Sequence, residues 1–304
     1  MENVRHVFII NPAAGKSDRS AELKEMIRQA AGKRGEEYEI FLTERPGHAR
    51  EIAAEQCRRY PEKTVRIYAC GGDGTLNEVV NGAARCENAA VTSYPSGSGN
   101  DFIRLFGADA SAFADIGRLL EGSEREIDFI ESEYGTSVNI LSVGLDARVA
   151  EGGAKYKRLP LVNGHGAYML SALEHIIRGM HRRYNIEVDG VDLSGKYCMI
   201  VAANGQYYGG GFNPVPDADI CDGLMDVLLV KAMSRLSAAK VIGAYKRGGY
   251  KELPQYIKHI RARELTVCAD SPMAINFDGE ILRAGRISMR VAAKKLRFIV
   301  PAGI

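Results

Sequence analysis

The sequence lacks any run of about 18 consecutive apolar residues, so we expect no helix that spans a membrane. Its first segment, MENVRHVFIINPAAGK, has no long apolar stretch with a cleavage site, which argues against a signal peptide. The six cysteines form no CxxC pair and no metal-like spacing. We therefore expect reduced thiols in a cytoplasmic protein. Internal repeats and low-complexity segments are also missing.

The chain also has little excess charge of either sign. Its formal net charge is +2, which argues neither for nor against nucleic acid, and we expect no nucleic acid partner. A hydrophobic content of 46% and a charged content of 26% are ordinary for a soluble protein with a sizeable core. The length of 304 residues allows one large domain or two smaller ones.

What is present is, first, an alternation of strand and helix patterns over residues 1–127. Short apolar or alternating runs at 4–11, 38–43, 65–70 and 89–95 are separated by stretches with helical spacing. Such alternation implies crossover connections and a mostly parallel sheet covered on both faces. We predict a Rossmann-like α/β domain here.

The pattern changes over residues 128–304, where strand-like runs separated by turn residues dominate. Two helical patterns interrupt them, one over 166–181 and one that begins near Ser234. We predict a second, antiparallel β-sandwich-like domain, whose last 15 or so residues could return to the first domain.

The loop Gly71-Gly72-Asp73-Gly74-Thr75 lies between the third predicted strand and a predicted helix. Glycines there allow backbone N–H groups to point outward, and the helix N-terminus adds a positive dipole, so phosphate is the expected ligand. Asp73 is unusual beside phosphate. It indicates either a Mg²⁺ ion or an acid that orients other loop groups, while a simple tight turn is the alternative for the whole loop.

Two further glycine loops follow predicted strands. One includes Asn11, Gly15 and Lys16, and the other runs from Gly97 to Asp101 and includes Ser98 and Asn100. Because parallel strands end at the same sheet edge, the three loops should meet there and bind one phosphate-bearing ligand. The Walker pattern GxxxxGK[ST] is absent.

The ordered motifs NPAAGK, GGDGTLNEVVNG, PSGSGNDF, NILSVGLDARV, ANGQYYGGGFNPVPDADICDG and FDGE resemble the bacterial diacylglycerol kinase-like lipid kinases. That family shares its catalytic domain with sphingosine and ceramide kinases and, more distantly, with NAD kinases. The resemblance implies an ATP- and Mg²⁺-dependent transferase of phospholipid metabolism, with its active site in the cleft between two domains. The implied reaction phosphorylates a lipid alcohol, with diacylglycerol giving phosphatidic acid as the expected case.

The resemblance also implies which residues contact the nucleotide. They are Asn11, Pro12, Ala13, Ala14, Gly15, Thr43, Gly72, Asp73, Gly74, Thr75, Leu76, Asn77, Glu78 and Ser98, and the loop patterns add Lys16, Asn100 and Asp101. Serine at 98 keeps the hydroxyl of the threonine that is usual in the family. Asp73 and Asp101 are the candidates to orient or hold the catalytic metal.

Two elements of the second domain carry further implied roles. The family holds a structural Mg²⁺ where this chain has Asp222, with Asp219 and Leu224 as backbone ligands, although Cys221 replaces a frequent second acid. An Asx-type turn is the alternative for this loop. The family places its proton acceptor in the DGE element, so Asp278 or Glu280 is expected to take the proton of the lipid hydroxyl; a hairpin turn with solvated acids is the alternative.

Other readings stay open. NAD kinases share the GGDG loop, but their TPTGSTAY string is absent, and a non-catalytic nucleotide- or lipid-binding regulator is a further alternative. Residues 151–184 contain six Lys/Arg and two acids, and residues 231–263 contain nine Lys/Arg and one acid. These runs fit either peripheral contact with an anionic membrane or a solvated surface. A homodimer is plausible.

Overall fold

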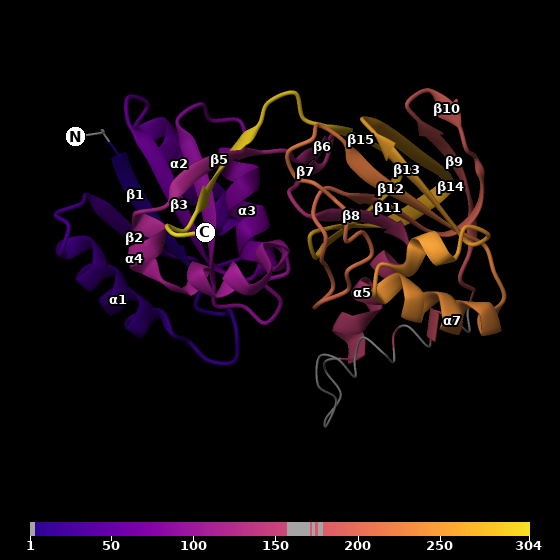
Figure 1. Cartoon of the computed structure of the whole chain (residues 1–304), viewed down its shortest axis with the longest axis horizontal. Helices are drawn as coiled ribbons and strands as arrows, with labels where there is room; N and C mark the ends of the chain where they lie inside the picture. The colour runs from indigo at the N-terminus through magenta and orange to yellow at the C-terminus, as the bar shows by residue number, and fades with distance from the viewer. Residues whose placement is uncertain (1–3, 157–170, 172–173, 176–178) are drawn as a thin grey trace. The chain divides into compact units, whose positions relative to one another are not determined.

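The computed structural model of the chain describes residues 4–156, 171, 174–175 and 179–304. They form two compact units, unit 1 with Met1–Asp128 and Ala293–Ile304 and unit 2 with Phe129–Ala292. Figure 1 shows helices and a mostly parallel sheet in unit 1, and a largely stranded unit 2. The predicted fold class, an α/β domain combined with an antiparallel β-rich domain, is confirmed.

Unit 1 is built on a six-stranded sheet with the order β2-β1-β3-β4-β16-β5. The neighbours from β2 to β16 are parallel, and β5 is antiparallel to β16. Most residues of β1, β3 and β4 are buried, as expected for strands covered on both faces. The strands are β1 (Val4–Ile10), β2 (Tyr38–Leu42), β3 (Thr64–Gly71), β4 (Ala89–Pro95), β5 (Ser123–Ile127) and β16 (Leu296–Val300).

Helices cover both faces of this sheet. On α1 the buried residues Leu23, Ile27 and Ala31 recur every four positions and form one apolar stripe. Helix α1 packs against α4, whereas α2 packs against α3, which is the division that right-handed crossovers produce. The helical elements are α1 (Ser20–Gly32), α2 (His48–Arg59), α3 (Asp73–Ala83), the 3₁₀ segment η1 (Phe102–Ala114) and α4 (Ile116–Leu120).

The strand order reverses between β1 and β3. The chain leaves β1 to form β2 at the sheet edge, then returns past β1 to add β3 and β4 on its other side. The connections that follow β1 and β3 therefore lead to opposite faces of the sheet. In open parallel sheets, ligands bind beyond the carboxyl ends of the strands at such a reversal.

The end of the chain completes unit 1. Strand β16 lies between β4 and β5, and the Thr92 hydroxyl donates a 2.8 Å hydrogen bond to the Ile299 carbonyl. Asp128, which is almost fully buried, forms an ion pair with Lys295 just before β16. Strand β16, about 200 residues from β4 in the sequence, thus extends the sheet of unit 1.

Unit 2 is dominated by strands, and all pairings between its described strands are antiparallel. Its elements are β6 (Ile130–Ser132), β7 (Gly135–Ser137), β8 (Ile140–Gly144), α5 (Leu145–Tyr156), β9 (Arg182–Val188), β10 (Val191–Asp192), β11 (Gly195–Ala203), β12 (Met225–Lys231), α7 (Arg235–Lys246), the 3₁₀ turn η2 (Gly249–Glu252), β13 (Ile257–Ala262), β14 (Glu264–Phe277) and β15 (Glu280–Val291).

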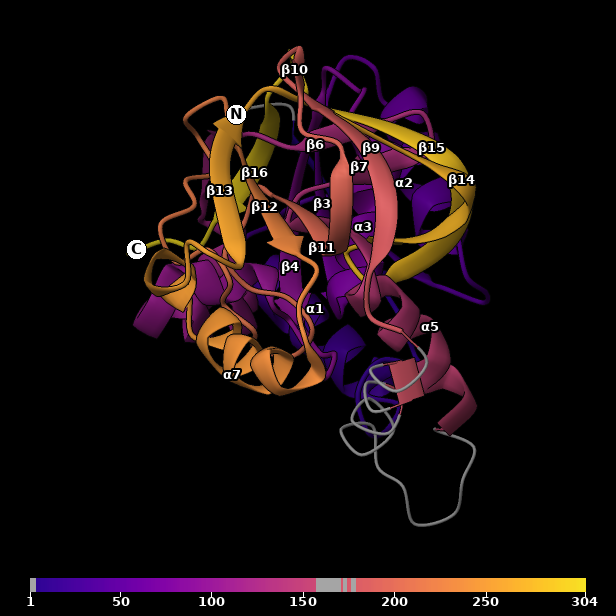
Figure 2. The same ribbon diagram turned by 90° about the vertical axis from the view of Figure 1, so that its right-hand side faces the viewer.

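The long strand β14 closes part of this sheet on itself. Its first half pairs with β9 and its second half pairs with β8, while β11 joins β9 to β8. The register between β14 and β15 shifts between Cys268 and Met273. Such irregularities bend a strand pair, and Figure 2 shows β14 and β15 as a curved pair.

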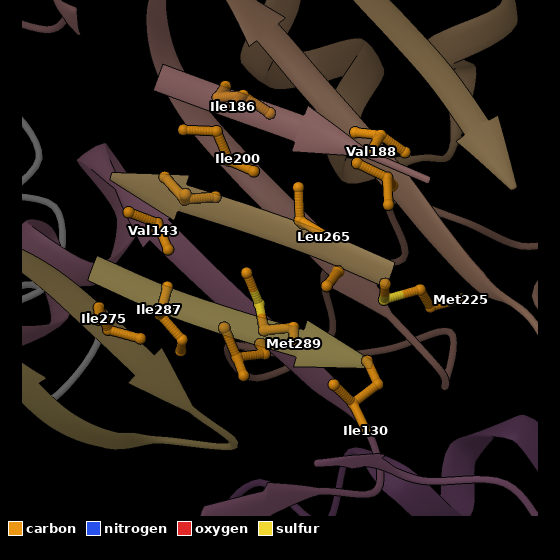
Figure 3. Packing of buried hydrophobic residues seen from close by; sticks show 14 of the residues in the cluster. Ile130, Val143, Ile186, Val188, Ile200, Met225, Leu265, Ile275, Ile287 and Met289 are labelled. Carbon is orange, nitrogen blue, oxygen red and sulfur yellow. The ribbon is translucent and has the colours of Figure 1, made fainter. Parts of the chain in front are cut away.

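Two apolar clusters hold unit 2 together. Alternate residues of β8 enter different clusters, with Leu141 and Val143 in one and Ile140 in the other. Figure 3 shows side chains of the first cluster, including Ile186 and Met289, meeting from several strands. The second cluster lies beneath α7.

The structure tests the two helical patterns expected in unit 2 to different extents. Helix α7 begins directly after Ser234, whose hydroxyl accepts the Ser237 N–H, so this prediction is confirmed. The helix predicted over 166–181 falls mostly outside the described residues, although Met180 is buried. Among the described helices, none is long and apolar enough to cross a membrane.

Candidate active site

The three glycine loops meet at the carboxyl edge of the unit 1 sheet. The Asn11 N–H donates to the Cys70 carbonyl (3.0 Å), which ties the end of β1 to the end of β3. The N–H groups of Ser96 and Gly97 both donate to the Gly71 carbonyl (3.0 Å each), which ties the loop after β4 to the same point. The loops therefore form one continuous backbone surface at the strand-order reversal.

Glycine is required where these loops touch. A Cβ on Gly97 would lie 2.3 Å from the Gly72 Cα, and a Cβ on Gly15 would lie 2.6 Å from the Ser96 carbonyl oxygen. Gly15 also has a φ of 81°, a conformation that favours glycine. The glycine spacing noticed in the sequence thus reflects close packing between the loops as well as access for a ligand to the backbone.

Asp73 orients the loop that follows β4. Its Oδ1 accepts hydrogen bonds from the N–H groups of Asp101 (2.6 Å) and Phe102 (3.4 Å), at the start of η1. Of the two explanations left open for this acid, the structure therefore shows the orienting one directly. A metal contact by Asp73 stays a prediction.

Two carboxylates lie close to Gly99. A Cβ on Gly99 would lie 2.5 Å from the Asp73 Oδ2 and 3.9 Å from the Asp101 Oδ2, so both carboxylates border the space that this glycine leaves. Carboxylate oxygens are the ligands that Mg²⁺ prefers. Asp101 also pairs with Arg104, and a metal ion held by these two carboxylates stays a prediction.

Asn11 and Thr75 join the first two loops through their side chains. The Asn11 amide donates to the Thr75 hydroxyl (3.0 Å), and its carbonyl oxygen accepts the Ala13 N–H (3.0 Å). Thr75 is buried. Both residues therefore shape the loops, and a direct nucleotide contact by either side chain stays a prediction.

Three residues predicted to contact the nucleotide are buried or hydrogen-bonded within unit 1. Leu76 and Asn77 are buried in α3. The two Glu78 carboxylate oxygens accept the N–H groups of Gly47 (2.8 Å) and Ala49 (3.0 Å), at the start of α2. Glu78 thus caps the N-terminus of α2 and ties this helix to α3, which carries the glycine loop.

The other predicted nucleotide residues lie at the same sheet edge. Thr43 follows β2, and its N–H donates to the Ile10 carbonyl (2.9 Å). Exposed positions in the loops are Ala13, Gly15, Lys16 and Ser98, while Pro12, Ala14, Gly72, Gly74 and Asn100 are half-buried. These residues can reach a bound ligand without rearrangement of the core.

Sequence reasoning missed Arg104. Its guanidinium lies 3.0 Å from the Asp101 Oδ1 and donates to the Gly99 carbonyl (3.2 Å). It places a positive charge beside the loop that follows β4. The signal that could have identified it is the spacing of three residues after Asp101, which suits an ion pair within one helical turn.

In unit 2 the DGE element forms the turn between β14 and β15. Asp278 has a φ of 47° and is 9% exposed. Its carboxylate accepts hydrogen bonds from the Ser137 hydroxyl (2.6 Å) and from the N–H groups of Val138 (3.1 Å) and Ile140 (2.8 Å). Asp278 therefore fixes the turn against the segment that enters β8.

Glu280 lies two residues further along and is exposed. Among the described residues, its carboxylate has no recorded side-chain partner. The two acids, which the sequence could not separate, thus have different surroundings: Asp278 accepts structural hydrogen bonds, and Glu280 faces solvent.

Further hydrogen bonds fix the segment that holds the Asp278 turn. The Asn139 carbonyl accepts the N–H groups of Asn204 (2.8 Å) and Gly205 (2.9 Å), and the Asn204 amide donates to the Val138 carbonyl (2.7 Å). Gly205 lets the Asn139 side chain approach closely, because a Cβ there would lie 2.2 Å from the Asn139 Oδ1. Sequence reasoning singled out the motifs that contain these residues but gave them no role.

The predicted structural metal loop is held by protein cations. One oxygen of Asp222 pairs with Arg261, and the other accepts the Leu224 N–H (2.9 Å). The Asp219 carboxylate accepts the Cys221 N–H (2.9 Å), which is the Asx-type turn kept as the alternative. No group of three or more His, Cys, Asp or Glu side chains in the described part of the chain is placed to hold a metal. Arg261 thus pairs with one oxygen of Asp222, and the role of Asp219, Asp222 and Leu224 as metal ligands stays a prediction.

Unit 2 also contains a buried acid with no expected role. Asp146, in the first turn of α5, is 7% exposed, and burial raises the pKa of its carboxyl group. Ser142 and Tyr208 lie beside it, and the Tyr208 hydroxyl is 2.9 Å from the Tyr245 hydroxyl of α7. These groups link α5, the segment after β11 and α7.

Comparisons with known proteins agree with this architecture. A protein of Xanthomonas campestris pv. campestris (strain 8004) named "Probable lipid kinase YegS-like" is 28% identical over 305 residues, which cover 94% of each chain. A crystal structure of a diacylglycerol kinase from Bacillus anthracis str. Sterne superposes with a TM-score of 0.70 at 19% identity, covering 99% of this chain and 98% of that one. Another chain from the same organism gives a TM-score of 0.77 at 22% identity, covering 99% and 96%.

The matches to protein families divide at nearly the same place as the two units. Residues 5–132 match the diacylglycerol kinase catalytic domain. Residues 139–300, more than half of the chain, match the YegS C-terminal NAD kinase beta sandwich-like domain. The chain therefore belongs to the family of diacylglycerol kinase-like lipid kinases that combine these two domains.

Proposed function

We propose that the protein transfers the γ-phosphoryl group of ATP to the hydroxyl of a lipid alcohol, with diacylglycerol as the first candidate and phosphatidic acid as its product. The observation that carries the proposal is the set of three interlocked glycine loops at the strand-order reversal of unit 1. Family membership supports a kinase acting on lipids. The identity of the lipid is the finer part of the proposal.

The donor is proposed to bind at the loops of unit 1. Backbone N–H groups at Gly72 and Gly74, together with the N-terminus of α3, suit a polyanion. Lys16 and Arg104 add positive charge near these loops. Phosphoryl transfer depends on such positioning and charge neutralisation more than on covalent chemistry.

The acceptor is proposed to lose its proton to Glu280. The lipid hydroxyl oxygen attacks the γ-phosphorus, its proton passes to the Glu280 carboxylate, and the bond from the γ-phosphorus to the bridging oxygen breaks as ADP leaves. The exposure of Glu280 supports this assignment over Asp278, whose oxygens already accept three hydrogen bonds. Asp278 is then a positioning residue for the turn.

Mg²⁺ bound with ATP would neutralise charge on the phosphates. Asp73 and Asp101 are the proposed residues for holding or orienting it, because both carboxylates border the space at Gly99. The further proposal of a structural Mg²⁺ at Asp219, Asp222 and Leu224 has less support, since Arg261 pairs with Asp222.

A second candidate is phosphorylation of NAD⁺. The observation that favours it is the match of residues 139–300 to a domain described as similar to that of NAD kinase. The names of the relatives favour a lipid acceptor instead. A non-catalytic regulator is a third candidate, which the same assay tests.

The deciding experiment incubates the purified protein with γ-labelled ATP and Mg²⁺. Separate reactions contain diacylglycerol, a polyprenyl alcohol, a sphingoid base or NAD⁺. We expect label in one or more lipids. Label in NADP⁺ alone would establish the second candidate, and label in none of the products would favour a regulator.

The proposal includes peripheral contact with an anionic membrane, because a lipid kinase must reach substrate in a bilayer. Residues 231–263 contain nine basic residues and one acid, and this positive charge supports it.

A homodimer in solution remains part of the proposal and is tested by sedimentation.

A further inference from the structure

Helix α7 presents two different faces. Its inner side is packed into the second apolar cluster of unit 2, through residues that include Val241 and Tyr245. On its outer side Leu236 is 90% exposed and Ile242 is 39% exposed. Leu236 has by far the largest exposed fraction among the large apolar side chains of the described residues. The outer side of α7 is thus solvated although it carries a bulky apolar residue.

The charged residues of the outer side are all basic. Arg235, Lys240, Lys246 and Arg247 are exposed, and α7 contains no acidic residue. At about 100° per residue, Arg235 lies on one flank of Leu236, and Lys240 lies on the other flank, one turn further along. Lys246 lies about 15 Å further along, at the C-terminal end of the helix, and Arg247 follows the helix. The exposed leucine therefore has two cations within about one turn, and two further cations lie at the other end of the helix.

Part of this face is engaged within the chain, since the Lys246 ammonium lies 5.3 Å from the centre of the Phe212 ring. A single exposed leucine on a mixed-charge surface needs no explanation. Here the cations share one sign and lie on both flanks of Leu236. A face that combines charges of one sign with an exposed leucine suits a surface that is both anionic and partly apolar. The same positive excess continues beyond the helix, since Lys231 and Lys258 are also exposed.

We infer that α7 is the membrane-docking element, with Leu236 inserted at the bilayer interface and the basic residues of α7, together with Arg247, beside anionic lipid headgroups. The occupant is an anionic bilayer because its surface offers both the negative charge and the apolar boundary that this face matches. Long basic side chains can keep their charge at the headgroups while a neighbouring apolar residue enters. The inference rests on the proposed lipid kinase function, which requires access to a bilayer.

The test measures vesicle binding by co-sedimentation for the full chain and its variants. Wild-type protein should bind vesicles of phosphatidylcholine mixed with phosphatidylserine, and should bind less as salt is added. Leu236→Ser should weaken binding about tenfold, since burial of one leucine side chain is lost. The double variant Lys240→Glu/Arg247→Glu should weaken it by at least about tenfold.

Matched variants of unit 2 provide the controls. Val191→Ser removes another exposed apolar side chain, on β10, and Lys196→Glu reverses an exposed charge on β11. Both should bind vesicles like the wild type. Because the Leu236 side chain is almost fully exposed and contributes little to the core, Leu236→Ser should leave the thermal unfolding temperature unchanged.

The outcomes separate this inference from the proposed function. Wild-type protein that phosphorylates soluble short-chain diacylglycerol, with Leu236→Ser binding vesicles unchanged, would overturn the inference and leave the function standing. Vesicle binding that depends on Leu236 without any lipid phosphorylation would overturn the function and keep the docking surface. Equal binding to pure phosphatidylcholine vesicles, or a change of oligomeric state in Leu236→Ser, would also contradict docking on anionic lipid.

Discussion

At the scale of single residues, the two acids of the DGE turn should respond differently to neutralisation. Glu280→Gln should lower kcat at least about tenfold, since a general base typically contributes 10²–10⁴-fold. The unfolding temperature should stay near that of the wild type because Glu280 is exposed. Asp278→Ala should instead destabilise unit 2 by about 2–4 kcal/mol, because three buried donors lose their acceptor.

Kinetic assays and urea unfolding of both variants test whether Glu280 affects kcat and Asp278 affects stability. Glu264→Gln, which changes another exposed acid of the same unit, is the control and should alter neither property. If Glu280→Gln retains full kcat while Asp278→Asn loses it without loss of stability, the roles of the two acids are reversed.

A second residue-scale prediction concerns His6, which is buried in unit 1. Its Nδ1 lies 2.8 Å from the Tyr68 hydroxyl, and Glu36 lies 3.2 Å from its Nε2. Burial, together with Arg66 and Arg5, lowers the His6 pKa from 6.5 to about 4. The folded state therefore holds this imidazole neutral, and stability falls as the pH drops from 6.5 toward 4.

At about pH 5 this single group should cost unit 1 about 2 kcal/mol relative to neutral pH. Urea unfolding of wild type and His6→Gln at both pH values measures the effect. The variant should lose less stability on acidification, whatever its stability at neutral pH. An equal loss in both proteins would show that other groups carry the acid sensitivity.

At the scale of elements, the loops that follow β3 and β4 depend on backbone contact between Gly72 and Gly97. Gly97→Ala should separate them, because its Cβ would lie 2.3 Å from the Gly72 Cα. We expect KM for ATP to rise at least about tenfold, as a 1 Å misplacement can cost about 100-fold in rate. Gly32→Ala, at the exposed C-terminal end of α1 with open space and no positive φ, is the control for a general glycine effect.

The measurement is a comparison of KM for ATP and KM for lipid in these two variants. Gly97→Ala should change mainly the first constant, because the loops are proposed to hold the donor. A selective rise of KM for lipid would place the lipid at these loops instead.

The loop from Asp217 to Asp226 supplies a prediction about metal. Asp222 pairs with Arg261, and Asp217 lies 2.6 Å from Lys251. If these cations hold the loop, removing Mg²⁺ with EDTA should leave the unfolding temperature nearly unchanged. Arg261→Ala should lower stability by about 1 kcal/mol, since the pair is partly exposed. A marked stabilisation by Mg²⁺ alone, absent in Asp222→Ala, would support the ligands expected from the sequence.

These elements also show what the sequence could predict. The runs at 4–11, 38–43, 65–70 and 89–95 correspond closely to β1 to β4, because buried strands need apolar residues at every position. Helix α7 was identified from its start at Ser234. The three loops could be placed at one edge, since parallel strands end together.

Long-range pairings carried no local signal. The last 15 or so residues were expected to be able to return to the first domain, but no local signal marks the break between β15, which ends at Val291 in unit 2, and β16, which begins at Leu296 in unit 1. Likewise, nothing near Asp278 indicates that its partners are Ser137 and Ile140, about 140 positions earlier. The difference between Asp278 and Glu280 depends on that pairing, so it required the structure.

At the scale of the whole molecule, each unit has its own core, and the proposed donor site belongs to unit 1. A nucleotide that binds only the folded loops should therefore stabilise unit 1 by mass action, by about 2.7 kcal/mol at a concentration about 100-fold above Kd. The probe is a non-hydrolysable ATP analogue with Mg²⁺. Hydrogen exchange of the slowest amides in β1, β3 and β4 should slow by about 100-fold.

The same experiment measures hydrogen exchange in unit 2 separately, at the amides of β9, β12 and β13. Their exchange rates should change little if the two units open independently. Adenosine, which lacks phosphates, is the control and should protect β1, β3 and β4 much less, because the glycine loops and the α3 N-terminus are expected to recognise the polyphosphate. Equal protection of both units would mean that they open as one cooperative body. Equal protection by adenosine and by the ATP analogue would contradict phosphate recognition at the loops, since the phosphates would then contribute nothing to binding.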